Sequence, residues 1–214
     1  MQNNVPVGQL PSSTAAAPLR SICVYCGSGP GTDPVFGHIA NELGRRMAEQ
    51  DIGLVYGGGD VGLMGMVARA VLEHGGHVTG IIPEFLRRRE NLLEDVQETM
   101  IVPDMHTRKQ AMFERADAFV ALPGGIGTLE ELVEQMTWAQ LGRHNKPILL
   151  LNTAGFWEPL LVLLAHMRRY GFIRPGLELS YLVTEQPEEV IPLLQDALRR
   201  HDRQSDDANI EGHF

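Results

Sequence analysis

The chain has 214 residues, 43% of them hydrophobic, and a formal net charge of -9 at pH 7. This length and composition fit one globular domain with an apolar core. A general nucleic-acid-binding protein is usually basic, so the negative charge disfavours that class. A transmembrane protein is also disfavoured, because no apolar run approaches the ~20 residues that span a bilayer.

Both ends of the chain differ in composition from its middle. Residues 1–19 are rich in Pro, Ser, Ala and Asn, and they lack the basic start and continuous apolar stretch of a signal peptide. Residues 201–214 are polar and acidic. We therefore expect flexible tails over residues 1–19 and 201–214, and a single folded domain over residues 20–200.

Cys23 and Cys26 form a C-x-x-C pair, which is also the pattern of redox and metal sites. Both lie in an apolar run that predicts a buried strand, and residues three apart on a strand point to opposite faces. Zinc would need further ligands, and the chain has no other cysteine. We interpret both as packing residues in a reducing, cytoplasmic compartment, and we expect no metal site.

Short apolar runs alternate with amphipathic stretches along the middle of the chain. The runs predict strands at residues 21–26, 53–56, 77–82, 98–102, 118–122, 147–151 and 181–184. The stretches between them predict helices at residues 34–49, 63–74, 104–116, 128–141, 156–169 and 187–200. Several strands are apolar throughout, as is typical of parallel strands covered on both faces. The alternation predicts an α/β fold with a doubly wound parallel sheet.

Glycine-rich turns follow three of the predicted strands. They contain Gly27 and Ser28, Gly58 and Gly59, and residues 124–128. In a doubly wound fold, ligands bind beyond the carboxyl ends of the strands. Glycine lets the backbone approach a ligand closely, and the N-terminus of a following helix favours phosphate. Three such turns at one sheet edge therefore predict a phosphate or nucleotide site.

The second glycine turn also allows a different interpretation. Gly57, Gly59 and Gly62 match the G-x-G-x-x-G of dinucleotide-binding proteins, and Glu84 lies roughly where a ribose-binding acid is expected. This match follows the second strand rather than the first, which weakens it. The sequence G-x-x-x-x-G-K-[ST] is absent, so the chain is not a P-loop enzyme.

The segment from Asp104 to Lys109 predicts a helix start, with Asp104 as the N-cap. Arg108 and Lys109 then lie near the first turn, where cations oppose the helix dipole. A nearby bound anion would favour this placement, and the alternative is a solvated charge pair partly offset by Asp104. Lys109 and Lys146 are the only lysines, and nothing around either supports pyridoxal phosphate as a cofactor.

The helix after the third glycine turn carries several carboxylates. Thr128 and Glu131 match the T-x-x-E capping box, which is a structural explanation for Glu131. The functional alternative is a carboxylate that emerges beside a phosphate-binding loop. Glu130, Glu134 and Thr137 share one helical face by spacing, so the helix start can present polar groups to a ligand. Spacing alone does not separate the two explanations.

Two segments together resemble one known family. Residues 123–131 read P-G-G-I-G-T-L-E-E, and residues 105–109 read M-H-T-R-K. Both are similar to signatures of the LOG (Lonely Guy) family of cytokinin riboside 5′-monophosphate phosphoribohydrolases, whose members are often labelled lysine decarboxylases. The glycine turn from Tyr56 to Gly65 and the T-W-A-Q-L-G at residues 137–142 also resemble this family, so the similarity covers about residues 21–200.

The resemblance implies a Rossmann-like single domain and a homodimer, and we expect no cofactor. The implied reaction is hydrolysis of the N-glycosidic bond of a cytokinin riboside 5′-monophosphate or AMP. Arg108 and Glu131 are the implied catalytic pair, and the glycine turns are expected to hold the 5′-phosphate. The implied substrate contacts are Glu90, Lys109, Thr137, Gly124, Gly125, Ile126, Gly127, Thr128, Leu129 and Glu130.

Two other function classes stay open at this point. A non-catalytic nucleotide sensor on the same fold would bind a nucleotide without forming product. A dinucleotide oxidoreductase would bind NADH. Within the enzyme class, the residues do not separate a cytokinin-specific hydrolase from a general AMP nucleosidase, because base selectivity depends on pocket shape.

Overall fold

The computed structural model describes residues 19–87, 92–174, 176 and 178–211. They form one seven-stranded parallel sheet in the order β4-β3-β2-β1-β5-β6-β7. The strands are β1 (Ser21–Tyr25), β2 (Gly53–Tyr56), β3 (Val78–Pro83), β4 (Glu98–Val102), β5 (Ala118–Ala121), β6 (Ile148–Leu151) and β7 (Leu182–Thr184). The predicted doubly wound parallel sheet is confirmed, and each strand lies within one residue of its predicted bounds.

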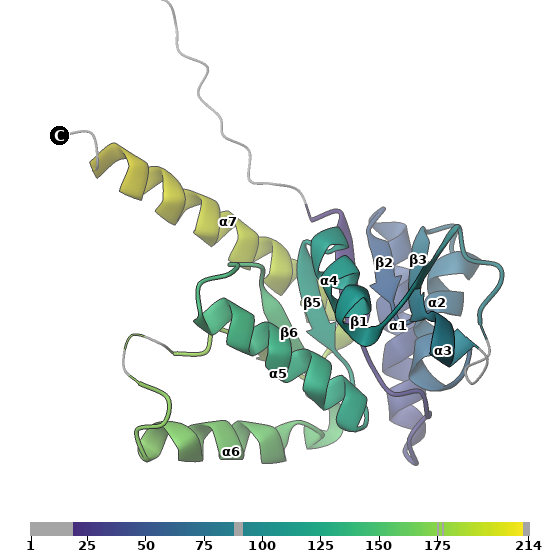
Figure 1. Cartoon of the computed structure of the whole chain (residues 1–214), viewed down its shortest axis with the longest axis horizontal. Helices are drawn as coiled ribbons and strands as arrows, with labels where there is room; N and C mark the ends of the chain where they lie inside the picture. Colours follow the sequence, from purple (N-terminus) through teal and green to yellow (C-terminus); the bar gives the residue numbers. More distant parts are fainter. Residues whose placement is uncertain (1–18, 88–91, 175, 177, 212–214) are drawn as a thin grey trace, which may run out of the picture.

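Helices cover both faces of this sheet (Figure 1). One face packs against α1 (Pro34–Glu49), α2 (Gly62–Glu73) and α7 (Pro187–Glu211). The other face packs against α4 (Met105–Arg115), α5 (Ile126–Gln140) and α6 (Glu158–Arg169). Two short helices, α3 (Glu84–Arg87) and η1 (Thr153–Gly155), were not predicted, because one turn is too short to leave a periodic pattern.

Strand β1 shows how the sequence fills both cores. Ile22 and Val24 pack on the side of α1, α2 and α7, whereas Cys23 and Tyr25 pack on the opposite side. Cys26 lies again on the first side, so the two cysteines lie on opposite faces, as predicted. Both are buried free thiols, which agrees with a packing role.

Helix α7 is longer than the sequence predicted. It continues past the expected end at Arg200 to Glu211, so the predicted flexible tail is helical up to that residue. Polarity suggested a tail, but residues 201–211 contain no glycine or proline and thus nothing that terminates a helix. Within the described part of the chain, no helix is both long and apolar enough to cross a membrane.

Strand β1 lies at the centre of the sheet, and the order in which strands are added changes sides there. Strands β2, β3 and β4 lie on one side of β1, and β5, β6 and β7 lie on the other. The carboxyl ends of β1 and β5 therefore flank the topological switch point, where ligands bind in open α/β sheets.

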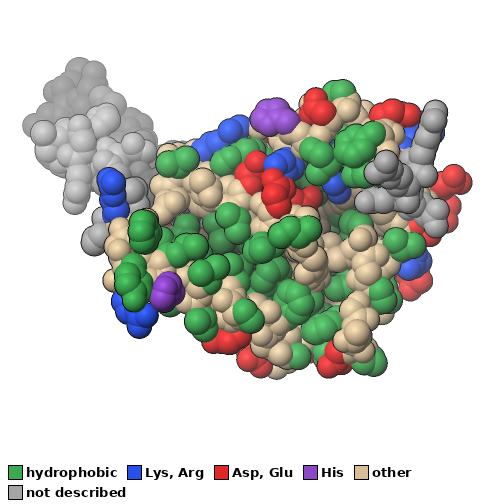
Figure 2. Space-filling view, turned by 60° about the horizontal axis from the view of Figure 1, so that its bottom comes forward, with side chains coloured by type: hydrophobic (Ala, Val, Ile, Leu, Met, Phe, Trp, Pro, Cys, Tyr) green, Lys and Arg blue, Asp and Glu red, His purple; other side chains and the backbone are tan. Residues whose placement is uncertain are grey.

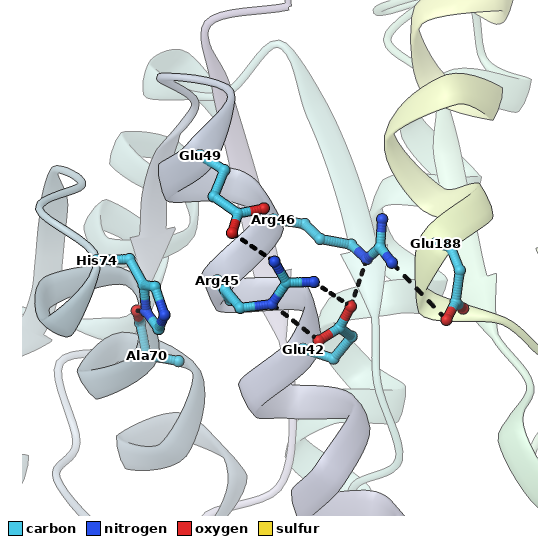
Figure 3. Close-up of polar contacts among 7 residues, drawn as sticks. All are labelled: Glu42, Arg45, Arg46, Glu49, Ala70, His74 and Glu188. Carbon is cyan, nitrogen blue, oxygen red and sulfur yellow. Dashed lines mark hydrogen bonds and ion pairs between the residues drawn. The ribbon is translucent and has the colours of Figure 1, made fainter.

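An ion-pair network on α1 joins this helix to α7 (Figure 3). Glu42 accepts hydrogen bonds from Nε of Arg45 and Nε of Arg46, at 3.0 and 2.6 Å. Nη2 of Arg46 also lies 3.8 Å from Oε1 of Glu188 on α7. The hydrogen bonds from Arg45 and Arg46 outweigh burial and lower the pKa of Glu42 to about 2.

Replacing Glu42 by glutamine should lower the melting temperature at pH 7 by about 2–4 °C, the size expected for loss of a partly exposed ion-pair network. The carboxyl of an unfolded chain titrates near pH 4.5. The stabilisation is therefore complete above that pH and is lost as the pH falls from about 4.5 toward 2. Thermal melts of both proteins across this range measure the difference.

Glu49→Gln on the same helix is the matched control. Glu49 is half exposed and pairs with Arg45 alone among the described residues, so its substitution should have a smaller effect. A difference between the wild type and Glu42→Gln that stays constant from pH 7 to about pH 3 would contradict the assignment of stability to ionised Glu42.

Candidate active site

The glycine turns after β1, β2 and β5 meet at the switch point. The amide of Gly27 donates to the carbonyl oxygen of Pro123 at 3.0 Å, and the amide of Leu63 donates to the carbonyl oxygen of Gly27 at 3.0 Å. A Cβ atom at Gly124 would lie 2.2 Å from Oγ1 of Thr128 and 2.9 Å from the amide nitrogen of Gly27. Glycine at position 124 therefore permits this close contact between the first and third turns.

Helix α5 begins directly in the third turn. Its N-cap is Gly125, and no side chain caps it. The capping-box explanation of Glu131 is wrong, because Thr128 and Glu131 both lie inside the helix, which starts two residues earlier than expected. A glycine N-cap has no side-chain signature in the sequence, and this explains the error. The amides of the first turn are left without helical acceptors and are free to bind an anion.

The start of α4 was predicted correctly. Asp104 is the N-cap, and its Oδ1 accepts a hydrogen bond from the amide of Thr107 at 2.7 Å. The cap fixes the first turn of α4. Arg108 comes directly after this turn, and its side chain points into the interior. The Arg108 side chain is consequently buried, with 6% of the residue exposed.

Backbone carbonyl groups hold the Arg108 guanidinium in one orientation. Nε donates to the carbonyl oxygen of Ile81 in β3 at 3.1 Å, and Nη2 donates to the carbonyl oxygen of Gly57 after β2 at 3.3 Å. Nη1 lies 3.8 Å from Oε1 of Glu131 on α5. Residues from β3, α4, α5 and the turn after β2 are thus joined around one charged group.

Glu131 is also buried, with 9% of the residue exposed. Burial and, after it, the negative charge of Glu131 raise the pKa of the Cys26 thiol. Burial likewise raises the pKa of Tyr25, with further contributions that include Glu131. Cys26 and Tyr25 are therefore neutral near pH 7, and the Cys26 thiol is a poor nucleophile.

Arg108 and Glu131 line a cavity of about 420 Å³ at the switch point. A cavity of this size suits a small-molecule ligand such as a mononucleotide. Its other described lining residues are Cys26, Gly27, Ser28, Met64, Leu86, Met105, Gly125, Ile126, Gly127, Thr128 and Glu130.

Three apolar lining residues, Met64, Leu86 and Met105, were not predicted. Met64 and Met105 lie in segments that the sequence singles out, Met64 within the second glycine turn and Met105 one helical turn before Arg108. Their positions in these two segments could have indicated that they line the site. Leu86 lies on the short helix α3, which left no signal in the sequence.

The dinucleotide interpretation fits the geometry poorly. In that motif the glycines allow the backbone to approach a pyrophosphate. Here the space beside Gly57 is filled by the Arg108 guanidinium, and a Cβ at Gly62 would lie 2.3 Å from the carbonyl carbon of Ser28. Glu84 pairs with Arg87 on the exposed helix α3.

Comparison with known proteins identifies the family. A family model described as "Possible lysine decarboxylase" matches residues 64–194. The chain is 46% identical over 185 residues to a probable cytokinin riboside 5′-monophosphate phosphoribohydrolase of Oryza sativa subsp. japonica, covering 86% of this chain and 76% of that protein. It is 45% identical over 185 residues to an Arabidopsis thaliana protein named cytokinin riboside 5′-monophosphate phosphoribohydrolase, covering 86% and 87%. The chain belongs to the LOG family.

Solved structures agree with the LOG-family fold. The Moco carrier protein of Chlamydomonas reinhardtii superposes with a TM-score of 0.63 at 20% identity, covering 86% of this chain and 99% of that one. The molybdenum cofactor binding protein of Rippkaea orientalis superposes with a TM-score of 0.63 at 22% identity, covering 84% and 97%. At these identities the similarity concerns the fold alone.

Some of the predicted substrate contacts lie away from the cavity. Thr137 is on the exposed face of α5, where its hydroxyl donates to the carbonyl oxygen of Val133 at 2.8 Å. Leu129 packs against the apolar core beneath α5. Gly58 and Gly59 contact residues 92–93 through a 3.4 Å hydrogen bond and an isolated bridge. Gly124 lines an adjacent cavity, and Glu90 lies outside the described residues.

Lys109, also assigned through the LOG family, pairs with two carboxylates of α5. Its Nζ lies 2.6 Å from Oε1 of Glu130 and 2.9 Å from Oε1 of Glu134. Burial lowers its pKa, but the bonds to Glu130 and Glu134 outweigh burial, and the pKa is raised. Lys109 is therefore charged near pH 7 and joins α4 to α5 beside the cavity that Glu130 lines.

Proposed function

We propose that this chain hydrolyses the N-glycosidic bond of adenine-type nucleoside 5′-monophosphates, either cytokinin riboside 5′-monophosphates or AMP. The products are the free base and ribose 5-phosphate. The observation that carries the proposal is the buried pair of Arg108 and Glu131 beside the uncapped start of α5. The names of the relatives supply the substrate class.

The phosphate subsite is the turn that begins α5. Its first-turn amides lack helical acceptors, and the positive end of the helix dipole lies there. Gly27 and Ser28 line the same cavity from the turn after β1. These groups bind the 5′-phosphate and hold the ribose beside Arg108 and Glu131.

Hydrolysis needs a group that stabilises positive charge on the sugar. The bond between C1′ and the base nitrogen breaks, its electrons leave with the base, and ribose becomes oxocarbenium-like, as in glycoside hydrolysis. Water then bonds to C1′ through its oxygen and loses one proton. In the overall reaction the departing base gains one proton. The Glu131 carboxylate stabilises the sugar cation and orients this water.

Arg108 acts electrostatically, because a guanidinium stays charged in proteins and is a poor proton donor. Its bonds to the carbonyl oxygens of Ile81 and Gly57 fix its position 3.8 Å from Glu131. From that position it orients the carboxylate and stabilises negative charge that develops on the departing base.

The description "lysine decarboxylase" does not fit the cavity. Pyridoxal phosphate chemistry needs a lysine that forms a Schiff base with the cofactor. Lys109 is paired with Glu130 and Glu134, and Lys146 donates to the carbonyl oxygen of Phe113 at 2.7 Å. Neither lysine is among the residues that line the cavity.

A comparison of three substrates tests the proposal and ranks the substrates. Purified protein is incubated with AMP, with isopentenyladenosine 5′-monophosphate and with adenosine, and the bases are separated chromatographically. The two nucleotides should release base, and adenosine should react about 100-fold more slowly, because it lacks the phosphate that the α5 turn binds. Binding of both nucleotides without any base release would favour a nucleotide sensor instead.

We also propose that the chain acts as a homodimer through α6. This helix has no buried residue, and apolar side chains gather on the face of the molecule shown in Figure 2. Exposed apolar residues on this helix and the turn after it are Val162, Leu163, Met167, Tyr170 and Phe172. A second copy of the chain would remove this apolar surface from water.

Met167→Asp should therefore convert the protein to a monomer, because a charge in an apolar interface is strongly unfavourable. Light scattering should give twice the 23.7 kDa chain mass for the wild type and the single mass for the variant. Ile101→Asp, at an exposed apolar residue of the edge strand β4, is the control and should stay dimeric. A wild type that is monomeric at micromolar concentration would contradict the dimer.

We infer a cytoplasmic location from the cysteines. Cys23 and Cys26, the two cysteines of the chain, are both free thiols. Proteins that work in reducing compartments keep such thiols.

A further inference from the structure

Gly57 lies at the carboxyl end of β2, directly against the buried Arg108 side chain. Its carbonyl oxygen accepts a hydrogen bond from Nη2 of Arg108 at 3.3 Å. A Cβ atom built on Gly57 would lie 2.1 Å from that same Nη2, 3.4 Å from Cζ of Arg108 and 3.1 Å from Sδ of Met64. No real Cβ approaches a neighbouring atom as closely as 2.1 Å, so any larger residue must displace the guanidinium.

The requirement for glycine at this position does not come from the backbone. The glycines with positive φ are Gly31, Gly58, Gly62, Gly75, Gly142, Gly155, Gly171 and Gly176, and Gly57 is not among them. Its φ therefore lies outside the left-handed region that favours glycine. What excludes a side chain is the space that Arg108 occupies.

Displacement of the guanidinium is expensive, because its other contacts are fixed. Nε of Arg108 is bonded to the carbonyl oxygen of Ile81 in β3, and Nη1 faces Glu131. Arg108 cannot move away from Gly57 without loosening at least one of these contacts, because all of them are made by nitrogens of the same planar guanidinium.

We propose that Gly57 is a positioning residue for Arg108, an inference that rests on the phosphoribohydrolase activity proposed above. Its lack of a side chain makes room for the guanidinium, and its carbonyl oxygen orients it toward Glu131. The second glycine turn thus serves the reaction by holding the arginine, and the phosphate is bound by the first and third turns.

Gly57→Ala should lower kcat by about 100-fold, the size of effect that follows from a misplacement of about 1 Å in a reacting group. KM should change little, because the α5 turn that binds phosphate is untouched. Gly53→Ala, at the start of the strand β2 that Gly57 follows, is the matched control. A Cβ at Gly53 makes only ordinary contacts, 3.6 Å from the carbonyl oxygen of Arg20 and 3.8 Å from that of His77. It should keep kcat within about threefold of the wild type.

A double-mutant cycle separates positioning from a general structural defect. Arg108→Lys should cost about 100-fold in the wild-type background but no more than about threefold in the Gly57→Ala background, because the arginine is already misplaced there. Equal losses in the two backgrounds would overturn the proposal.

A stability cycle tests the same contact even if Gly57→Ala is inactive or folds poorly. Gly57→Ala should lower the melting temperature by about 4–10 °C when Arg108 is present, the range expected for an overpacked interior. In an Arg108→Ala background the clash is gone, and the further decrease should be about 2 °C or less. The same decrease in both backgrounds would show that Met64 or the backbone is responsible, and would overturn the proposal.

Different results would refute the proposed function and the proposed role of Gly57. A wild-type protein that releases no base would refute the proposed function, whereas the melting temperatures would still report whether Gly57 makes room for Arg108. A wild-type protein that releases base while Gly57→Ala keeps full kcat would refute the positioning role alone.

Discussion

Glu131→Gln should reduce kcat for base release about 10³-fold while the protein stays folded. Glutamine keeps the shape of the side chain but removes the negative charge, which stabilises the sugar cation and orients water. Groups with these roles commonly contribute about 10²–10⁴-fold to the rate. Single-turnover release of base, measured by chromatography, gives the rate of the chemical step directly.

The fold should tolerate this change, because Arg108 retains its bonds to the carbonyl oxygens of Ile81 and Gly57. We expect a melting temperature within about 5 °C of the wild type. Glu114→Gln on α4 is the control, since Glu114 is an exposed residue that accepts a hydrogen bond from Gln110. Near-normal turnover by Glu131→Gln would remove Glu131 from the catalytic pair.

Arg108→Lys is also expected to have a large effect, a loss of about 100-fold in kcat. Lysine keeps the positive charge but has a single ammonium in place of the planar guanidinium. One ammonium cannot bond to the carbonyl oxygens of Ile81 and Gly57 and also face Glu131 as the guanidinium does.

The matched control is Arg115→Lys at the other end of α4, where Nη1 of Arg115 lies 2.8 Å from Oε2 of Glu98 at a partly exposed site. It should change kcat by less than about twofold. If Arg108→Lys kept the wild-type kcat, the charge alone would be sufficient, and the fixed orientation of the guanidinium would have no role in the reaction.

The fold was largely predictable because its signals are local. Parallel strands that are buried on both faces give continuous apolar runs, and the amphipathic helices between them give a clear periodicity. Strand β2 was predicted with its observed bounds, Gly53–Tyr56, and so was helix α1, whose N-cap is Asp33. The errors fell at helix ends that carry weak signals, such as the glycine N-cap of α5 and the polar end of α7.

The candidate site was predictable only in part, because its most specific contacts join distant segments. Sequence patterns placed Arg108 near a helix start and Glu131 after a glycine turn, but the 3.8 Å between their side chains depends on how α4 and α5 pack on the same face of the sheet. The pairing of Lys109 with two carboxylates is likewise a tertiary contact. Gly57 looked like part of a phosphate loop, and only the position of Arg108 shows what fills the space beside it.

The most direct test of the central claim is the product stoichiometry of the wild-type protein with AMP and with isopentenyladenosine 5′-monophosphate. Free base and ribose 5-phosphate should appear in equal amounts, each matching the nucleotide consumed, and both should be lost in Glu131→Gln. A nucleoside with inorganic phosphate would indicate cleavage of the phosphate ester instead. That outcome, or nucleotide that stays intact although it binds, would contradict hydrolysis of the N-glycosidic bond by the Arg108–Glu131 pair.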